Sequence, residues 1–199
     1  MNRRLSTADA LDSLLQSESP LERALLAEPA FRKGLLWGEP RFGHPEGTVG
    51  FHVREVLDNV SMIPHLSPID RSRLRLVALA HDAFKYLEDR SRPRDWSKHH
   101  GVLARRFMES YTSDTVVLDL IEAHDDAYYC WLYKHRNPSP RSLSPLLEKV
   151  GYCLQLYYLF FKCDTQTGDK TQAPLRWFEN EVVAIEVVKI KPFWPWERE

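Results

Sequence analysis

The segment Leu74–Lys85, LRLVALAHDAFK, runs apolar for most of two helical turns and then ends in polar side chains. Its apolar residues recur at intervals of three and four, which is typical of the buried face of an α-helix. His81 continues that apolar face, and Asp82 lies about 100° further around the same helix. Lys85 follows one turn after His81. A helix that carries such groups into a protein core requires partners for them there.

Four other predicted helices repeat this pattern, because each places a histidine or an aspartate on an apolar face. These residues are His52, His100, His124 and Asp164. A carboxylate that follows the apolar run YYLFF is costly to bury alone, whereas imidazole is largely neutral at neutral pH. A divalent metal ion resolves this conflict, because it binds imidazole nitrogens and balances the charge of Asp82 and Asp164. A lone buried histidine is more often a hydrogen-bonded core residue, so the predicted metal site depends on the whole group.

The composition indicates an ordinary globular chain. Its 199 residues suit one domain with a core, and a net charge of -1 gives no electrostatic reason to expect nucleic acid as the main partner. No apolar run reaches the length of a membrane span, and the N-terminus lacks the apolar core of a signal peptide. The three cysteines have no C-x-x-C spacing, which favours reduced thiols in a cytoplasmic protein.

Helical periodicity dominates the chain, so the predicted fold class is all-α. Prolines fall mostly between the periodic segments, where they would separate helices. The predicted helices include one that starts from a cap at Thr48, one that starts at Asp70 and one that runs unbroken from Ser113 to Trp131. Only the segment 180–190, NEVVAIEVVKI, has enough β-branched residues to leave helix and strand both open.

The order His52, then His81-Asp82, then Asp164 resembles the HD-domain superfamily of metal-dependent phosphohydrolases, which is named after the adjacent pair. The sequence HDAFK is similar to the family's His-Asp-hydrophobic-Gly-Lys, with Phe84 where glycine is usual. The sequence HPEGTVGFH, which ends at His52, resembles the entry to the HD domain of bacterial CCA-adding enzymes. The resemblance implies a single HD-domain helical bundle over residues 44–180. It also implies N-terminal helices over 1–43 that pack on the core, and a short C-terminal extension over 181–199.

The resemblance also implies a set of metal ligands. Members with one metal need only His52, His81, Asp82 and Asp164, whereas His100 and His124 lie where binuclear members carry further ligands. Asp82 would then bridge two ions. His99 and His100 both remain candidates, although His99 would share its helical face with Arg106. One or two divalent ions are expected, and manganese, iron, cobalt, nickel, zinc and magnesium are not distinguished.

The function implied by the resemblance is hydrolysis of a phosphate ester by metal-activated water. The expected substrate is a small molecule of the nucleotide type, with no membrane partner and with oligomerisation left open. Asp82, Lys85 and Asp125 are the predicted catalytic residues. Lys85 could reach a phosphate oxygen or only close its helix, and Asp125 could act as a base or only hold a ligand histidine. Five other residues could line the pocket or have no role there. They are the loop arginines Arg90, Arg92 and Arg94 and the pair His44 and Glu46.

Two other functions remain open from the sequence. Some HD proteins with six ligands hold a mixed-valence di-iron pair and cleave C–C or C–P bonds with oxygen. The other alternative is a non-catalytic helical module, stapled by metal, that binds a nucleotide or a protein. Metal content and turnover distinguish these functions from phosphate-ester hydrolysis.

Overall fold

Short helices, separated by loops and by proline, glycine and His-Asp turns, are the only regular elements of the described chain. The computed structural model describes residues 8–136 and 142–191. Those residues form α-helices and 3₁₀ turns, with no strand among them, so the predicted all-α class is confirmed. The elements are α1 (Ala8–Leu15), α2 (Pro20–Ala27), α3 (Pro29–Leu35), α4 (Val49–Ser61), α5 (Pro68–Ala80), η1 (Lys85–Leu87), η2 (Trp96–Lys98), α6 (His100–Met108), α7 (Thr115–Ala123), α8 (Asp126–Arg136), α9 (Ser144–Val150), η3 (Gly151–Cys153), α10 (Leu154–Thr165) and α11 (Ala173–Glu181).

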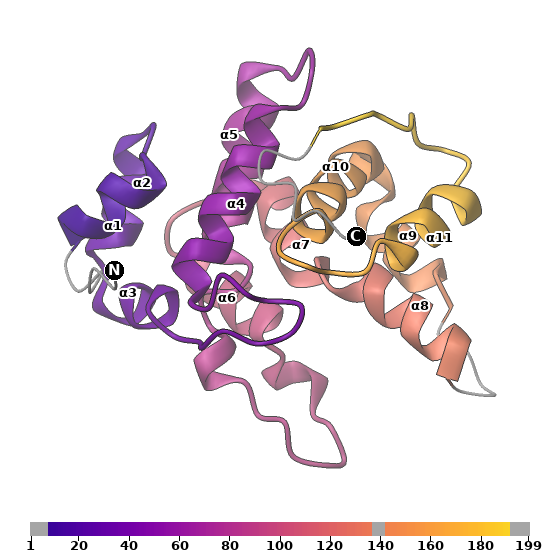
Figure 1. The fold of residues 1–199 in the computed structure, drawn as a ribbon, viewed down its shortest axis with the longest axis horizontal. Helices are drawn as coiled ribbons and strands as arrows, with labels where there is room; N and C mark the ends of the chain where they lie inside the picture. Colours follow the sequence, from indigo (N-terminus) through magenta and orange to yellow (C-terminus); the bar gives the residue numbers. More distant parts are fainter. Residues whose placement is uncertain (1–7, 137–141, 192–199) are drawn as a thin grey trace.

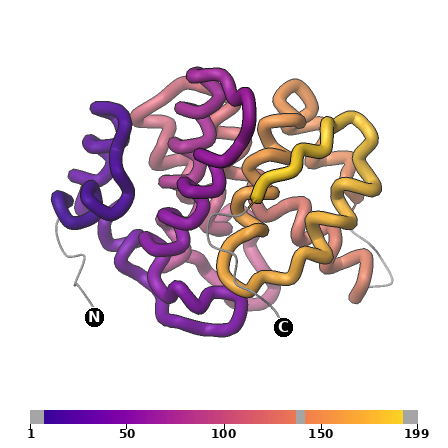
Figure 2. Tube along the Cα trace, turned by 45° about the horizontal axis from the view of Figure 1, so that its top comes forward, coloured from indigo at the N-terminus to yellow at the C-terminus, as the bar shows by residue number. Residues whose placement is uncertain are grey.

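The helices surround a central group made of α4, α5, α7 and α10. The N-terminal helices α1–α3 lie at one end of the molecule, and α8 and α11 lie together at the other (Figure 1). Helix α4 packs on α5, α5 packs on α7, and α10 packs on both α4 and α5. The chain therefore crosses the molecule from its indigo end to its yellow end, with the central helices between (Figure 2).

Several helices differ from the sequence prediction at their ends. Helix α5 begins at Pro68 rather than Asp70, because the Ser67 hydroxyl accepts a hydrogen bond from the Asp70 backbone N–H. The predicted long helix from Ser113 to Trp131 is two helices, α7 and α8, that meet at a turn. The segment 182–190 is neither helix nor strand. The Gln155 side chain of α10 donates to the Glu186 carbonyl and accepts from its N–H, so it replaces a partner strand at that point.

One glycine brings the N-terminal helices against the turn that follows α5. A Cβ atom on Gly34 of α3 would lie 1.5 Å from the Ala83 carbonyl oxygen, so only glycine allows this approach. Ala83 comes directly after the His81-Asp82 pair. Helix α3 therefore supports the turn that carries this pair.

A buried ion pair also fastens the N-terminal helices to the core. The Arg75 guanidinium of α5 donates to both carboxylate oxygens of Glu22 in α2, at 2.8 and 3.0 Å. Both side chains are almost fully buried. The boundaries expected at residues 43 and 180 remain a prediction, and the last part of the C-terminal extension, 192–199, lies outside the described residues. In the described part of the chain, no helix has both the length and the apolar character needed to cross a bilayer.

Candidate metal centre

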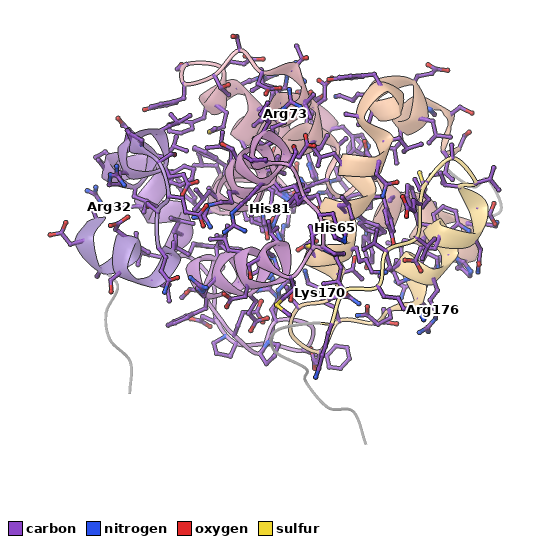
Figure 3. All side chains as sticks on the ribbon, turned by 90° about the horizontal axis from the view of Figure 1, so that it is seen from above. Arg32, His65, Arg73, His81, Lys170 and Arg176 are labelled. Carbon is purple, nitrogen blue, oxygen red and sulfur yellow. The ribbon has the colours of Figure 1, made fainter. Side chains whose placement is uncertain are left out.

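The structure brings the six predicted ligand side chains together near the middle of the molecule, where Figure 3 labels His81. His52 lies within α4, His100 is the first residue of α6, and Asp164 lies in the last turn of α10. His81 and His124 directly follow the last residues of α5 and α7, rather than lying within those helices as predicted. The six residues are His52, His81, Asp82, His100, His124 and Asp164.

The first cluster consists of His52, His81 and Asp164. The Nε2 atoms of the two histidines lie 3.3 Å apart. The Asp164 Oδ1 atom lies 2.9 Å from the His52 Nε2 atom and 3.8 Å from the His81 Nε2 atom. One ligand atom from each residue lies within 4.8 Å of the others, so a single ion could contact all three.

The second cluster consists of His100, His124 and Asp82. The two histidine Nε2 atoms lie 3.1 Å apart. The Asp82 Oδ1 atom lies 3.3 Å from the His100 Nε2 atom and 3.5 Å from the His124 Nε2 atom. These ligand atoms also lie within 4.8 Å of one another. The second cluster therefore has the same two-histidine, one-carboxylate composition as the first.

Asp82 joins the two clusters through its two carboxylate oxygens. Its Oδ2 atom faces the first cluster, 3.4 Å from the His81 Nε2 atom and 3.7 Å from the His52 Nε2 atom. Its Oδ1 atom faces the second cluster and is buried without a hydrogen-bond donor among the described residues. A buried carboxylate oxygen in this position requires a positive partner.

The helix ends fix the orientation of His81 and His124. The Nδ1 atom of His81 lies 2.9 Å from the Ala78 carbonyl oxygen, and the Nδ1 atom of His124 lies 2.7 Å from the Ile121 carbonyl oxygen. A carbonyl only accepts, so each Nδ1 carries a hydrogen and donates it. The Nε2 atom of each neutral ring then has a lone pair that faces its cluster, as a metal ligand requires.

Carboxylates face the Nδ1 atoms of the other two histidines. The Glu46 Oε1 atom lies 3.3 Å from the His52 Nδ1 atom, and the Glu88 Oε2 atom lies 3.4 Å from the His100 Nδ1 atom, which makes no hydrogen bond among the described residues. Each of the four imidazoles therefore has an acceptor on its Nδ1 side and its Nε2 atom toward a cluster. Such outer carboxylates commonly fix the tautomer of ligand histidines.

The electrostatics of both clusters show that they need positive charge. Burial would lower the pKa of His124, but Asp125 and Asp82 outweigh burial and raise it to about 9. Burial and Lys170 act to lower the pKa of His52, but contacts with Asp164 and Glu46 raise it above the ordinary imidazole value. Each facing pair of Nε2 atoms can thus hold one proton between them. A divalent cation fits the same positions, because the carboxylates and the imidazoles are its usual ligands.

His99 has a different role from His100. Its Nδ1 atom accepts a hydrogen bond from the Gly101 backbone N–H at 3.2 Å, which caps α6. Its Nε2 atom therefore carries the hydrogen of the neutral ring, and it lies 3.5 Å from an Asp125 carboxylate oxygen and 3.7 Å from one of Glu88. The structure thus places His100 in the second cluster and His99 behind it, although His99, His100 and Glu88 also lie close enough to count as a potential ligand group.

Asp125 and Lys85, predicted to be catalytic, both lie at the clusters. The Asp125 Oδ2 atom is 3.4 Å from the His100 Nε2 atom and 3.6 Å from the His124 Nε2 atom. Burial would raise the pKa of Asp125, but the neighbouring histidines outweigh burial and hold it well below the usual carboxyl range. The Lys85 Nζ atom lies 2.5 Å from the Asp82 Oδ2 atom, which it reaches from the 3₁₀ turn η1.

A cavity of about 530 Å³ opens onto both clusters. Its lining includes the buried Asp82 and His100 and the partly buried Asp125, and its walls carry basic and aromatic side chains. The basic residues are Arg41, Lys85, Arg90, Arg94 and Lys170, and the aromatic residues are Phe42, Tyr128, Tyr129 and Phe161. The cavity can therefore receive an anion beside the clusters and an apolar or aromatic group further out.

The structure also shows where the other residues that were predicted to line the pocket lie. Arg90 and Arg94 line the cavity and both bond the Glu88 carboxylate, whereas Arg92 is not part of the lining. His44 also lines the cavity, and its Nδ1 atom lies 2.9 Å from the Glu46 carboxylate. Glu46 therefore contacts two histidines, since it also faces His52.

Two residues of the site were missed in the sequence. Glu88 contacts the His100 ring from a polar loop in which only the arginines were predicted to reach the pocket. The Lys170 Nζ atom lies 2.9 Å from the Asp164 Oδ1 atom and carries a second ammonium group to the first cluster; Figure 3 shows Lys170 beside the central region. The position of Lys170 six residues after a predicted ligand was the only available signal.

An all-helical scaffold with two adjoining His₂Asp clusters under one polar cavity defines a metal-binding helical domain. Residues 48–141 match the family model of the HD domain. The matched residues carry an HD domain, which is typical of a superfamily of metal-dependent hydrolases in general, and the predicted resemblance is confirmed over this segment. Asp164 lies beyond the matched residues, yet the fold places it against His52. No curated protein and no solved structure gave a significant match to the chain.

Proposed function

We propose that this HD protein hydrolyses the phosphate ester of a small molecule of the nucleotide type. The main support for the proposal is the position of the Asp82 carboxylate, because each of its two oxygens faces a different pair of histidines. A bridging carboxylate between two clusters suits a pair of divalent ions, with His52, His81 and Asp164 as further ligands on one side and His100 and His124 on the other. The ligand roles of these six residues are part of the proposal.

When bound, divalent ions lower the pKa of a coordinated water and polarise a phosphoryl oxygen. The residues of the protein would then position the ester and exclude other groups. Lys85 and Lys170 carry positive charge to the carboxylates that face the cavity, where a phosphate oxygen could take the place of one carboxylate contact. In the overall reaction, the oxygen of water bonds to phosphorus, the P–O bond of the ester breaks, and the alcohol leaves with a proton.

Asp125 and Glu88 complete the second cluster. Asp125 faces both His100 and His124 from the cavity side, and its lowered pKa keeps it ionised, so it can bind alongside those ligands. Glu88 anchors the His100 ring and is itself held by Arg90 and Arg94. These contacts fix ligand orientation before a substrate enters, which is the contribution expected of outer residues in a metal site.

Metal analysis followed by a phosphate-release screen tests the proposal. Purified protein should hold two divalent ions per chain, and it should release inorganic phosphate from at least one member of a panel of nucleotides. The isosteric variant Asp82→Asn should lose metal and nearly all turnover, because it removes the charge shared by both clusters. Asp9→Asn, a change at an exposed aspartate in α1, is the matched control and should keep both properties.

Other outcomes of the same measurements would overturn the proposal. Two irons per chain with oxygen consumption and no phosphate release would identify the di-iron oxygenase expected as the alternative. Tight nucleotide binding without turnover under every metal tested would identify a non-catalytic module. Full turnover in Asp82→Asn would exclude the bridging role of Asp82.

A further inference from the structure

An aromatic ring stands exposed at the edge of the cavity. Phe42 lines the cavity, yet 90% of its surface is exposed to solvent. Among the described residues, it makes no contact with another aromatic ring. An exposed ring in the lining of a cavity is available to stack on a bound ligand.

Hydrogen bonds hold the backbone at Phe42 in a defined place beside the cavity. Phe42 lies in a tight turn in which the backbones of Arg41 and His44 bond each other, with distances of 3.1 and 2.8 Å. Gly43 adopts the left-handed conformation that the turn requires, with φ of 83°. Its N–H donates to the Asp169 carboxylate at 2.5 Å, which fastens the turn to the loop before α11.

The same turn is connected to the first metal cluster. The His44 ring packs edge-on against the His52 ring, with 5.5 Å between ring centres, and the Glu46 carboxylate faces both histidines. The backbone of the turn that carries Phe42 is therefore placed relative to a predicted metal ligand. A backbone that is already ordered loses little conformational freedom when a ligand binds.

Aromatic and basic groups complete the outer part of the cavity. Tyr128 in the first turn of α8 is 38% exposed and also lines the cavity. The Arg41 side chain is exposed, and among the described residues it forms no ion pair. The inner part is formed by carboxylates, lysines and histidines, so an anionic group fits inside and a planar ring fits at the edge.

We propose that Phe42 is a specificity residue that stacks on a planar heteroaromatic ring in the alcohol part of the substrate ester. This inference rests on the proposed function, because it takes the phosphate to lie at the clusters. It adds a selection rule: esters with such a ring are preferred over esters that share the sugar and the phosphate but lack the ring. Base stacking on an aromatic side chain contributes about 5- to 150-fold to binding.

The test compares two esters that differ only in the ring. Adenosine 5′-phosphate and ribose 5-phosphate are each assayed for phosphate release, and each is titrated calorimetrically into the purified protein. Wild-type protein should prefer adenosine 5′-phosphate by about tenfold or more in kcat/KM and in Kd. Phe42→Ala should lower this preference about tenfold, mainly through KM, whereas Phe42→Trp should retain it.

Phe42→Leu is the matched control, because it keeps an apolar side chain of similar size but removes the aromatic face. The inference requires Leu to behave like Ala and Trp to behave like Phe. It is overturned if all three variants show the wild-type preference, or if Ala and Leu weaken both esters equally, since the turn would then have only a structural role. A loss of self-association with an unchanged preference would also overturn it in favour of a protein contact.

The two proposals fail in different ways. If no member of the nucleotide panel releases phosphate, the proposed function fails, and the calorimetric preference still decides the role of Phe42. If both esters are hydrolysed with equal kcat/KM and bind with equal Kd, the phosphohydrolase function stands and the role of Phe42 is excluded.

Discussion

The Nε2 atoms of His100 and His124 lie 3.1 Å apart, although His100 begins α6 and His124 directly follows α7. The His124 Nδ1 atom donates to the Ile121 carbonyl at 2.7 Å, and the Glu88 carboxylate lies 3.4 Å from the His100 Nδ1 atom. A facing pair of nitrogens needs either a proton or a cation between its members, because two lone pairs repel. This relationship makes the second cluster directly testable.

The double variant His100→Gln with His124→Gln should hold half as much metal as the wild-type protein. The three residues of the first cluster are untouched, so one ion and the fold should remain. Turnover should fall by about 10²-fold or more, with a smaller change in KM, because the lost ion would act on the reacting groups. Elemental analysis and steady-state kinetics check this outcome. One ion per chain in both proteins would instead identify a mononuclear site.

The second cluster also depends on a close approach of α6 to α7. A Cβ atom on Gly101 would lie 2.8 Å from the Glu122 carbonyl oxygen and 3.3 Å from the His124 Nδ1 atom. Gly101→Ala should push the two helices apart, destabilise the protein by about 1–3 kcal/mol and weaken metal binding at the second cluster. Chemical denaturation and metal stoichiometry measure both effects.

Gly151→Ala is the control for this prediction. A Cβ atom on Gly151 would have no neighbour within 4 Å. Its stability should change by less than about 1 kcal/mol and its metal content should not change. Equal behaviour of the two alanine variants would show that the α6–α7 approach does not determine the second cluster.

Metal affinity at the second cluster should increase with pH. The pKa of His124 is raised to about 9, mainly because Asp125 and Asp82 outweigh its burial, so the metal-free protein holds a proton on this ring near neutrality. A ligand histidine must release that proton. The affinity should therefore increase about tenfold per pH unit from about pH 7 to about pH 9, and then level off. Calorimetry in buffers of different ionisation enthalpy measures the released proton.

The same group affects the stability of the metal-free protein with a definite sign. Its folded-state pKa lies above the unfolded value, so its contribution is fully present below about pH 6.5 and is lost as the pH rises through about 9. His124→Gln should abolish this dependence and the proton release together. A metal affinity that is flat between about pH 7 and 9 in the wild-type protein would contradict the protonated His124.

The buried pair Arg75 and Glu22 should fasten the N-terminal helices to the core. Arg75→Met leaves the Glu22 carboxylate buried beside one backbone N–H, and it should lower the free energy of unfolding by about 3–5 kcal/mol. Arg73→Met, which removes a half-exposed pair with Asp114, should cost less than about 1 kcal/mol. Urea denaturation of both variants measures the difference. Equal losses in the free energy of unfolding would show that burial does not make the Arg75–Glu22 pair more stabilising than the half-exposed Arg73–Asp114 pair.

Local sequence patterns predicted the fold class, which is confirmed, and the six side chains that the structure brings together. Spacing within each helix shows which side chains share the apolar face, so His52, His81 and Asp164 could be predicted to point inward. The unbroken helix predicted through His124 was wrong, because the break falls where the ring turns back to the Ile121 carbonyl. Helical periodicity shows which residues share a face of a helix. It does not show that a side chain hydrogen-bonds to a carbonyl at the end of its own helix.

Only the tertiary structure decided how these residues are grouped. Which oxygen of Asp82 faces which histidine pair, and whether His99 or His100 enters the second cluster, depends on distances between helices. Those distances are determined by packing between residues far apart in sequence, such as Gly34 against Ala83. Three residues that support or line the site lie in loops, and they could not be predicted for the same reason. They are Glu88, Lys170 and Phe42. A loop has no repeating face, so its sequence does not show the direction of its side chains, and the helices on either side determine it.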